Sequence, residues 1–179
     1  MPLTHFTISI RCKSYLKKYF TTLYGDPIEL KQSQAFADTI LTKLCNKSTY
    51  RIGEKNANIC HHAVKNYTGK LIMKIPFNFF YRIDKSPSIE LQYNINLYLQ
   101  KVFEEDFCEV VQRAHTWANI TKKIAIEKFA DNHAIIIDEE ITYEALKQIE
   151  HRYRKDPKKR NKLVAKVSLH HSITEKGKN

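Results

Sequence analysis

Cys60, His61 and His62 stand in a row in this 179-residue chain, and His170-His171 forms a second pair of metal-binding side chains. Adjacent residues do not readily bind one ion together, and no fourth ligand stands at zinc-finger spacing. The expectation is therefore that these are surface histidines, with no metal site and no other cofactor.

Cys108 and His115 have the residue types of a nucleophile and its base. Seven residues along a helix separate them by about 10 Å, which is too far for direct proton transfer. An acidic stretch between them could bind a divalent cation only if a second element supplied further carboxylates. A solvated face, or a face that meets a basic one, is the better interpretation of Glu104, Glu105, Asp106 and Glu109.

Tyr143 and Tyr153 could serve as recombinase nucleophiles, but the supporting Arg and His residues cannot be placed. The chain contains no P-loop, GxGxxG, GxSxG or HExxH motif. The sequence thus predicts no catalytic residue and a protein that is not an enzyme.

The clearest chemical signal is an excess of cations. The chain has 30 Lys and Arg against 19 Asp and Glu, a net charge of +11 and a pI near 9.4. Residues 1–100 hold 14 cations and 6 acids, residues 101–146 hold 5 and 10, and residues 147–179 hold 11 and 3. Two basic ends around an acidic middle favour basic faces, and basic faces favour an anionic partner such as nucleic acid.

The composition is that of a globular protein, with 42% hydrophobic residues, 9 Phe and 10 Tyr. No apolar run approaches the ~18 residues of a membrane span, so no membrane partner is expected. The N-terminus lacks the pattern of a secretory signal, and the four cysteines are far apart. Together these features predict reduced thiols and a cytoplasmic protein.

The elements that must position the cations begin with a strand-helix-helix unit over 1–45. Alternating apolar residues predict a strand over 6–11, with Phe6, Ile8 and Ile10 facing inward. Helical spacing follows in Tyr15, Leu16, Tyr19, Phe20 and Leu23, up to a stop at Gly25. A second helix is predicted over 33–45.

A polar connection over 46–69, with a short helix around 59–64, is the best candidate for a boundary between lobes. A second unit over 70–118 then repeats the order of strand, short helix and longer helix. Its strand, 70–77, is restricted to an edge or an end by Pro76. Its long helix starts near Ser86 and runs to about His115.

A C-terminal helix pair is predicted over 119–157, with helices at 121–132 and 143–155 and Thr142 as the second cap. Residues 158–179 look like a mobile basic tail. The fold class is therefore α+β, mostly α: a helical core, a small two-stranded antiparallel ribbon, the helix pair and the tail.

The strand-helix-helix pattern of 1–45 and 70–118 resembles ribbon-helix-helix DNA-binding proteins. The resemblance implies that segments 6–11 and 70–77 are neighbouring antiparallel strands whose outward side chains enter a major groove. Those side chains are Thr7, Ser9, Arg11, Lys70 and Lys74, with the apolar Ile72 among them. The alternative is a small sheet that covers a helical core, with its cations merely solvated.

A second basic region lies on the helix over 143–155 and just beyond it. Its cations stand opposite the apolar stripe, as in a recognition helix, although the loop before this helix is longer than a helix-turn-helix allows. These cations would bind phosphates without choosing a base sequence. They are Lys147, Arg152, Arg154, Lys155, Lys158, Lys159 and Arg160.

The run TISIRCKSYLKKYFTTLYGDPIEL, with the later AIEKF and EEITYEALKQIEHRYRK, resembles small uncharacterised proteins of Bacteroidetes prophages and mobile elements. That resemblance implies a mobile-element setting and a DNA-related role, without an activity or a functional residue. The sequence as a whole predicts a DNA-binding regulator or accessory protein that prefers duplex DNA to RNA and could form a homo-oligomer. The alternative is a protein–protein assembly module, in which the acidic 101–109 of one copy meets the basic end of another.

Overall fold

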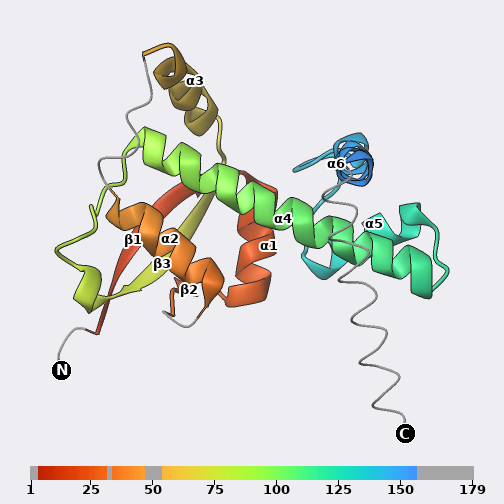
Figure 1. Ribbon diagram of the computed structural model, residues 1–179, viewed down its shortest axis with the longest axis horizontal. Coiled ribbons are helices and arrows are strands. Elements are labelled where there is room, and N and C mark those ends of the chain that lie inside the picture. Colours follow the sequence, from red (N-terminus) through yellow and green to blue (C-terminus); the bar gives the residue numbers. More distant parts are fainter. Residues whose placement is uncertain (1–3, 32–33, 47–53, 157–179) are drawn as a thin grey trace, which may run out of the picture. The chain divides into compact units, whose positions relative to one another are not determined.

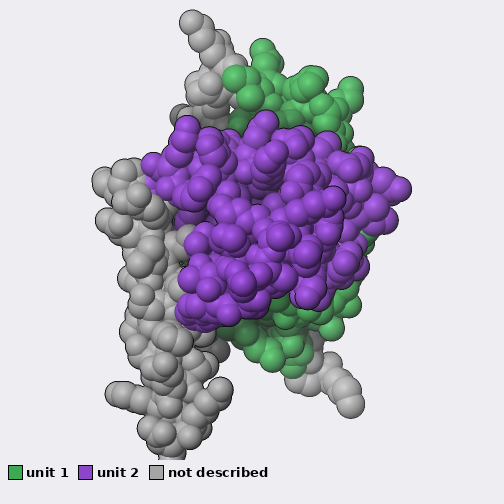
Figure 2. All heavy atoms as spheres, turned by 90° about the vertical axis from the view of Figure 1, so that its right-hand side faces the viewer, with its two compact units in different colours: residues 1–101 green, residues 102–179 purple. Residues whose placement is uncertain are grey.

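The computed structural model describes residues 4–31, 34–46 and 54–156. The chain forms two compact units, residues 1–101 (unit 1) and 102–179 (unit 2), which are coloured separately in Figure 2. Unit 1 contains all three named strands of the described chain, and the polar connection 46–69 lies within it. Each unit has its own core and is described by itself.

The sheet of unit 1 has the strand order β1-β3-β2 (Figure 1). β1 (His5–Cys12) pairs antiparallel with β3 (Gly69–Pro76), which confirms the predicted pairing of 6–11 with 70–77. The short strand β2 (Ile28–Glu29), which the sequence analysis did not predict, pairs parallel with β3. The ribbon is therefore part of a three-stranded sheet. Pro76 is the last residue of β3, where its missing N–H costs the ladder little.

Four α-helices and a turn complete unit 1: α1 (Ser14–Tyr24), α2 (Ala35–Cys45), α3 (Glu54–Lys65), the 3-10 turn η1 (Phe77–Phe79) and α4 (Ile89–Trp117). α4 contributes its residues up to Lys101 to unit 1 and the rest to unit 2. Gly25 ends α1 at a φ of +84°, a conformation that glycine adopts without steric cost. α3 is longer than the predicted helix over 59–64.

One face of the sheet covers the core of unit 1. Inward side chains of β1 and β3, such as Ile8, Ile10 and Met73, are buried. Stacked rings of Phe20, Phe36 and Tyr98 join α1, α2 and α4. Leu23, which was predicted to belong to the buried stripe of α1, is instead 48% exposed. It lies in the last turn of the helix, beyond the region that the sheet covers.

Unit 2 consists of α4 from Val102 on, α5 (Lys122–Asn132) and α6 (Tyr143–Lys155). Its core contains Phe103, Phe107 and Phe129 with ring centroids 5.1–6.0 Å apart. Thr142 caps α6 as predicted, because its Oγ1 accepts a bond from Ala145 N at 3.1 Å. On α5, Ile124 has the helical spacing of a core residue, but Ile126 fills the core and Ile124 is exposed.

The α+β, mostly helical class is confirmed, with six α-helices and a small sheet in the described chain. No helix among the described residues is both long and apolar enough to cross a lipid bilayer. The predicted tail 158–179 lies outside the described residues.

Candidate nucleic-acid interface

The second face of the sheet is not covered by the core and carries the cations that the sequence pattern singled out. Arg11 on β1 and Lys70 and Lys74 on β3 are exposed. Between the two lysines lies Ile72, which is 39% exposed. We call the outward surface of these two strands the open face; its residues are Thr7, Ser9, Arg11, Lys70, Ile72 and Lys74.

Strand register places two cations of the open face directly opposite each other. Arg11 pairs with Lys70, Ser9 with Ile72 and Thr7 with Lys74. The backbone of Arg11 bonds to α4 instead of β3: its N–H donates to Gln92 Oε1 at 3.1 Å, and its carbonyl accepts from Asn96 Nδ2 at 2.6 Å. Arg11 and Lys70 thus form a non-hydrogen-bonded pair, the type with the shorter Cα separation of about 4.5 Å.

Such a like-charged pair is unfavourable unless an anion lies between or above the two side chains. Among the described residues, no ion pair or side-chain hydrogen bond neutralises Arg11, Lys70 or Lys74. Glu29 is the register partner of Lys74, but its carboxylate lies 3.6 Å from His5 Nε2 and forms an ion pair with Lys31 at 3.8 Å. The open face therefore presents cations whose charge is available to a ligand.

A pocket of about 440 Å³ extends the basic surface beyond the strands. It is lined by Arg11, by His61, Val64 and Lys65 of α3, and by Ile89 and Gln92 of α4. The sequence analysis did not select Lys65 or His61 as site residues. The pocket depends on how α3 packs near the start of β3. The one sequence signal for Lys65 was its position a few residues before that strand.

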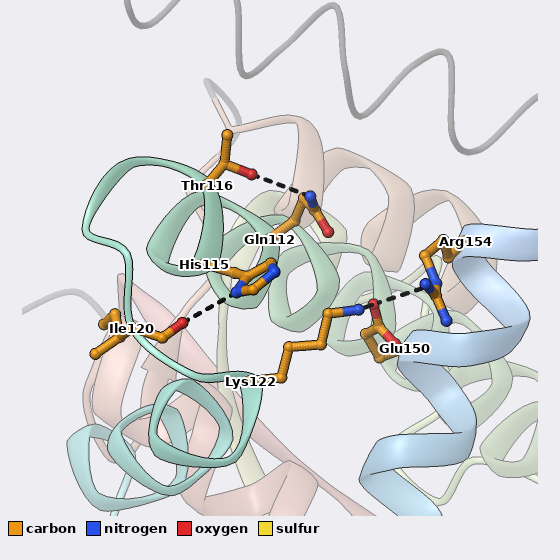
Figure 3. A network of polar contacts seen from close by, with 7 residues as sticks. All are labelled: Gln112, His115, Thr116, Ile120, Lys122, Glu150 and Arg154. Carbon is orange, nitrogen blue, oxygen red and sulfur yellow. Dashed lines mark hydrogen bonds and ion pairs between the residues drawn. The ribbon is translucent and has the colours of Figure 1, made fainter.

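The cations of α6 lie in a different electrostatic setting. Lys147 pairs with Glu144 at 3.4 Å. Arg154 lies 3.8 Å from the buried carboxylate of Glu150, which Lys122 of α5 approaches at 2.6 Å (Figure 3). The pocket beside this network, about 400 Å³, is lined by both glutamates as well as by the cations. This surface carries both signs of charge and has no clear preference for an anion.

Two cations of α6, Arg152 and Lys155, are exposed and have no ion pair with a described residue. The unit that carries them has a lower net positive charge than the unit that carries the sheet. Unit 1 holds 15 Lys and Arg against 6 Asp and Glu, whereas unit 2 holds 15 against 13. Lys158, Lys159 and Arg160, the remaining predicted contacts, lie outside the described residues.

The groups that could do covalent chemistry are poorly placed for it. Cys108 is buried, while the Nδ1 atom of exposed His115 lies 3.0 Å from the carbonyl of Ile120 (Figure 3). Burial raises the pKa of Tyr153 to about 12, which opposes formation of a phenolate nucleophile. Cys60 points into the core and its two histidine neighbours point outward. No three potential metal-binding side chains cluster within the described residues.

Comparisons with protein-family models, with curated proteins and with solved structures found no match to this chain.

Proposed function

We propose that the protein binds duplex nucleic acid through the open face of the β1–β3 ribbon. The observation that supports this most is the Arg11–Lys70 pair, two cations directly opposite on an exposed face with no described carboxylate bonded to either. Nucleic-acid phosphates are the partner that relieves this repulsion.

The dimensions of the site favour DNA over RNA. A two-stranded ribbon fits the major groove of B-DNA, and the deep, narrow major groove of A-form RNA excludes it. Arg11 and the two lysines have the donors for guanine O6 and N7, and the Thr7 and Ser9 hydroxyls suit several base edges. The basic residues of α6 and of 158–160 would add phosphate contacts that do not depend on base sequence.

A non-catalytic role as a regulator or accessory protein of a phage or mobile element is part of this proposal. The mobile-element setting rests on the sequence resemblance alone. The non-catalytic part is supported by the burial of Cys108 and by the surroundings of Tyr153, since burial raises the pKa of Tyr153 and so suppresses the phenolate that a nucleophile needs.

A salt titration of affinity for a mixed-sequence DNA duplex tests the interface. Replacing Arg11, Lys70 and Lys74 by Ala should weaken binding about 100-fold near 0.1 M salt and reduce the slope of log K against log salt by roughly 2–3. The matched control removes three exposed cations that the proposal does not assign to the interface: Lys101→Ala, Lys123→Ala and Lys128→Ala.

If the two triple variants weaken binding equally, the affinity depends on the total charge of the protein and not on the ribbon. If the wild-type protein binds no duplex even at 20 mM salt, the proposal fails. A third variant that replaces Lys158, Lys159 and Arg160 by Ala measures the share of the C-terminal cations, which should lower affinity by less than the ribbon variant does.

A protein–protein module is the second candidate, and one feature of unit 2 favours it. An apolar hollow of about 310 Å³ is lined by Val110, Arg113, Ala114, Trp117 and Ala118 at the end of α4. The sequence analysis described this module as the acidic residues 101–109 of one copy meeting the basic end of another. That version has less support, because Glu109 is buried and pairs with Arg113 at 2.9 Å. Self-association that Trp117→Ala abolishes, in a protein that binds no duplex, would support this candidate.

A further inference from the structure

The segment that follows β3 carries an unusual density of aromatic rings and cations. We call residues 77–85 the aromatic turn; its rings are Phe77, Phe79, Phe80 and Tyr81. Backbone bonds close it tightly: Phe80 N donates to Phe77 O at 3.0 Å, and Ile83 N donates to Phe79 O at 3.1 Å. Phe77 N also donates to Thr4 O at 3.0 Å, which ties the turn to the residue before β1.

Tyr81 is the exposed ring of this turn. Its neighbours anchor the chain on both sides, because Ile83 is buried and Phe80 packs against Phe6 and Phe77 with ring centroids 5.4 and 4.7 Å apart. Tyr81 itself is 89% exposed and contacts Phe80 edge to face at 5.4 Å. The turn, which lies at the end of the sheet opposite α3 (Figure 1), thus presents one large aromatic ring to solvent.

Two cations of the turn lie over the rings of its other aromatic residues. Lys85 Nζ lies 4.0 Å from the centroid of Phe80, and the guanidinium carbon of Arg82 lies 5.7 Å from that of Phe79. Neither cation has an ion pair with a described carboxylate. A hollow of about 270 Å³ lies beside Phe79 and Arg82, with its other wall on α2.

We propose that the aromatic turn is a second nucleic-acid contact, which takes unpaired nucleobases. An open aromatic ring flanked by cations is the combination by which proteins hold single strands, with bases stacked on the ring and phosphates on the cations. The turn starts directly after the ribbon, three positions beyond Lys74. Unpaired nucleotides that continue from a bound duplex past this end of the ribbon are the ligand proposed for Tyr81.

This inference rests on the proposed function, and it identifies unpaired nucleotides as the ligand of the aromatic turn next to the open face. The test compares a blunt DNA duplex with the same duplex that carries a three-nucleotide pyrimidine overhang, by fluorescence anisotropy at fixed salt. The overhang should raise the affinity of the wild-type protein about 5-fold or more. Tyr81→Ala should remove this gain and leave the affinity for the blunt duplex unchanged, while Tyr81→Phe should keep the gain.

A 5-iodouracil placed in the overhang gives a second readout. Under irradiation it should crosslink to Tyr81, as identified by mass spectrometry, and the crosslink should persist in Tyr81→Phe. Trp117→Ala, which removes an exposed aromatic side chain of unit 2, is the matched control and should change neither readout. Because Tyr81 is so exposed, the circular dichroism of Tyr81→Ala should match that of the wild type.

The outcomes separate this inference from the proposed function. Binding of the blunt duplex without any gain from the overhang would overturn the inference alone. Single-strand binding that depends on Tyr81, with no duplex binding, would overturn the proposed duplex function and support the inference. A Tyr81→Ala protein that changes its oligomeric state but keeps the overhang gain would show that the ring contacts protein, and would overturn the inference.

Discussion

The open face of the sheet and the exposed face of α6 have the same sequence pattern but different electrostatic surroundings. Both are amphipathic elements whose outward positions are rich in Lys and Arg. On α6, Glu144 and Glu150 neutralise Lys147 and Arg154 in part, whereas on the sheet the carboxylate of Glu29 lies beside His5 and pairs with Lys31. Basic sequence thus predicts an anion-binding surface only where the fold leaves the cations without a carboxylate partner.

The largest effect on this comparison should come from breaking the ribbon. A Cβ at Gly69 would lie 2.9 Å from the carbonyl oxygen of Cys12 and 3.1 Å from that of Lys13. Gly69→Val should therefore cost about 3 kcal/mol of stability and weaken duplex binding, since it displaces Lys70 from Arg11. Denaturant unfolding and the DNA titration measure the two effects.

The control for this change is Gly25→Asn, where a Cβ meets nothing within 4 Å but the φ of +84° disfavours a side chain. It should cost about 1 kcal/mol and leave duplex binding intact. An equal loss from both substitutions would mean that close packing at the ribbon end is unimportant.

High pH should destabilise both regions, but the loss of stability should begin at a different pH in each. Burial raises the pKa of Cys12 in β1 from 9.0 to about 12 and the pKa of Tyr153 in α6 from 10.0 to about 12. Above pH 9 the unfolded thiol ionises while the folded one keeps its proton, so stability falls as pH rises. Below pH 9 both states hold the proton and the effect is absent.

By pH 11 the Cys12 contribution should amount to about 3 kcal/mol. Cys12→Ala should flatten the fall in stability from pH 9 onward, and Tyr153→Phe should flatten it only from pH 10 onward. Denaturant midpoints measured at half-unit steps of pH distinguish the two onsets. Parallel curves for the wild type and Cys12→Ala would contradict the assignment.

Freeing the cations of unit 2 should make the two regions more alike. Glu150→Gln removes the carboxylate that Lys122 and Arg154 share, and should cost about 1–2 kcal/mol because both cations are partly exposed. It should also steepen the salt dependence of DNA binding, since two cations become available.

Glu144→Gln is the matched substitution at an exposed pair and should change stability by less than about 0.5 kcal/mol. If Glu150→Gln binds DNA no more tightly than Glu144→Gln does, the pairing of cations with Glu150 does not explain why α6 differs from the sheet in binding anions.

The smallest effect is a gain. Ile72→Lys adds a cation between Lys70 and Lys74 on the open face, and should raise duplex affinity roughly 5- to 10-fold near 0.1 M salt. Ile136→Lys adds the same charge at another exposed isoleucine, in unit 2, and should have little effect. Comparable gains from both would show that total charge governs binding wherever it lies.

Much of the fold follows from local pattern. The alternation in β1, the apolar stripe of α2 and the Thr142 cap were predicted from neighbouring residues and are present in the structure. Errors occurred where burial depends on distant packing. Ile124 and Leu23 have the right helical spacing but face solvent, and the two residues of β2 carry too little pattern to be recognised without β3 beside them.

Local pattern alone gives the alternation of inward and outward side chains along β1 and β3, because the period of a strand depends only on local backbone geometry. This alternation identified Arg11, Lys70 and Lys74 as outward cations on two strands. Which cations face a carboxylate is set by the packing of distant elements, because Coulomb energy depends on distance through space. Glu150 reaches Lys122 across 28 residues of chain, and Arg11 meets Lys70 across the sheet.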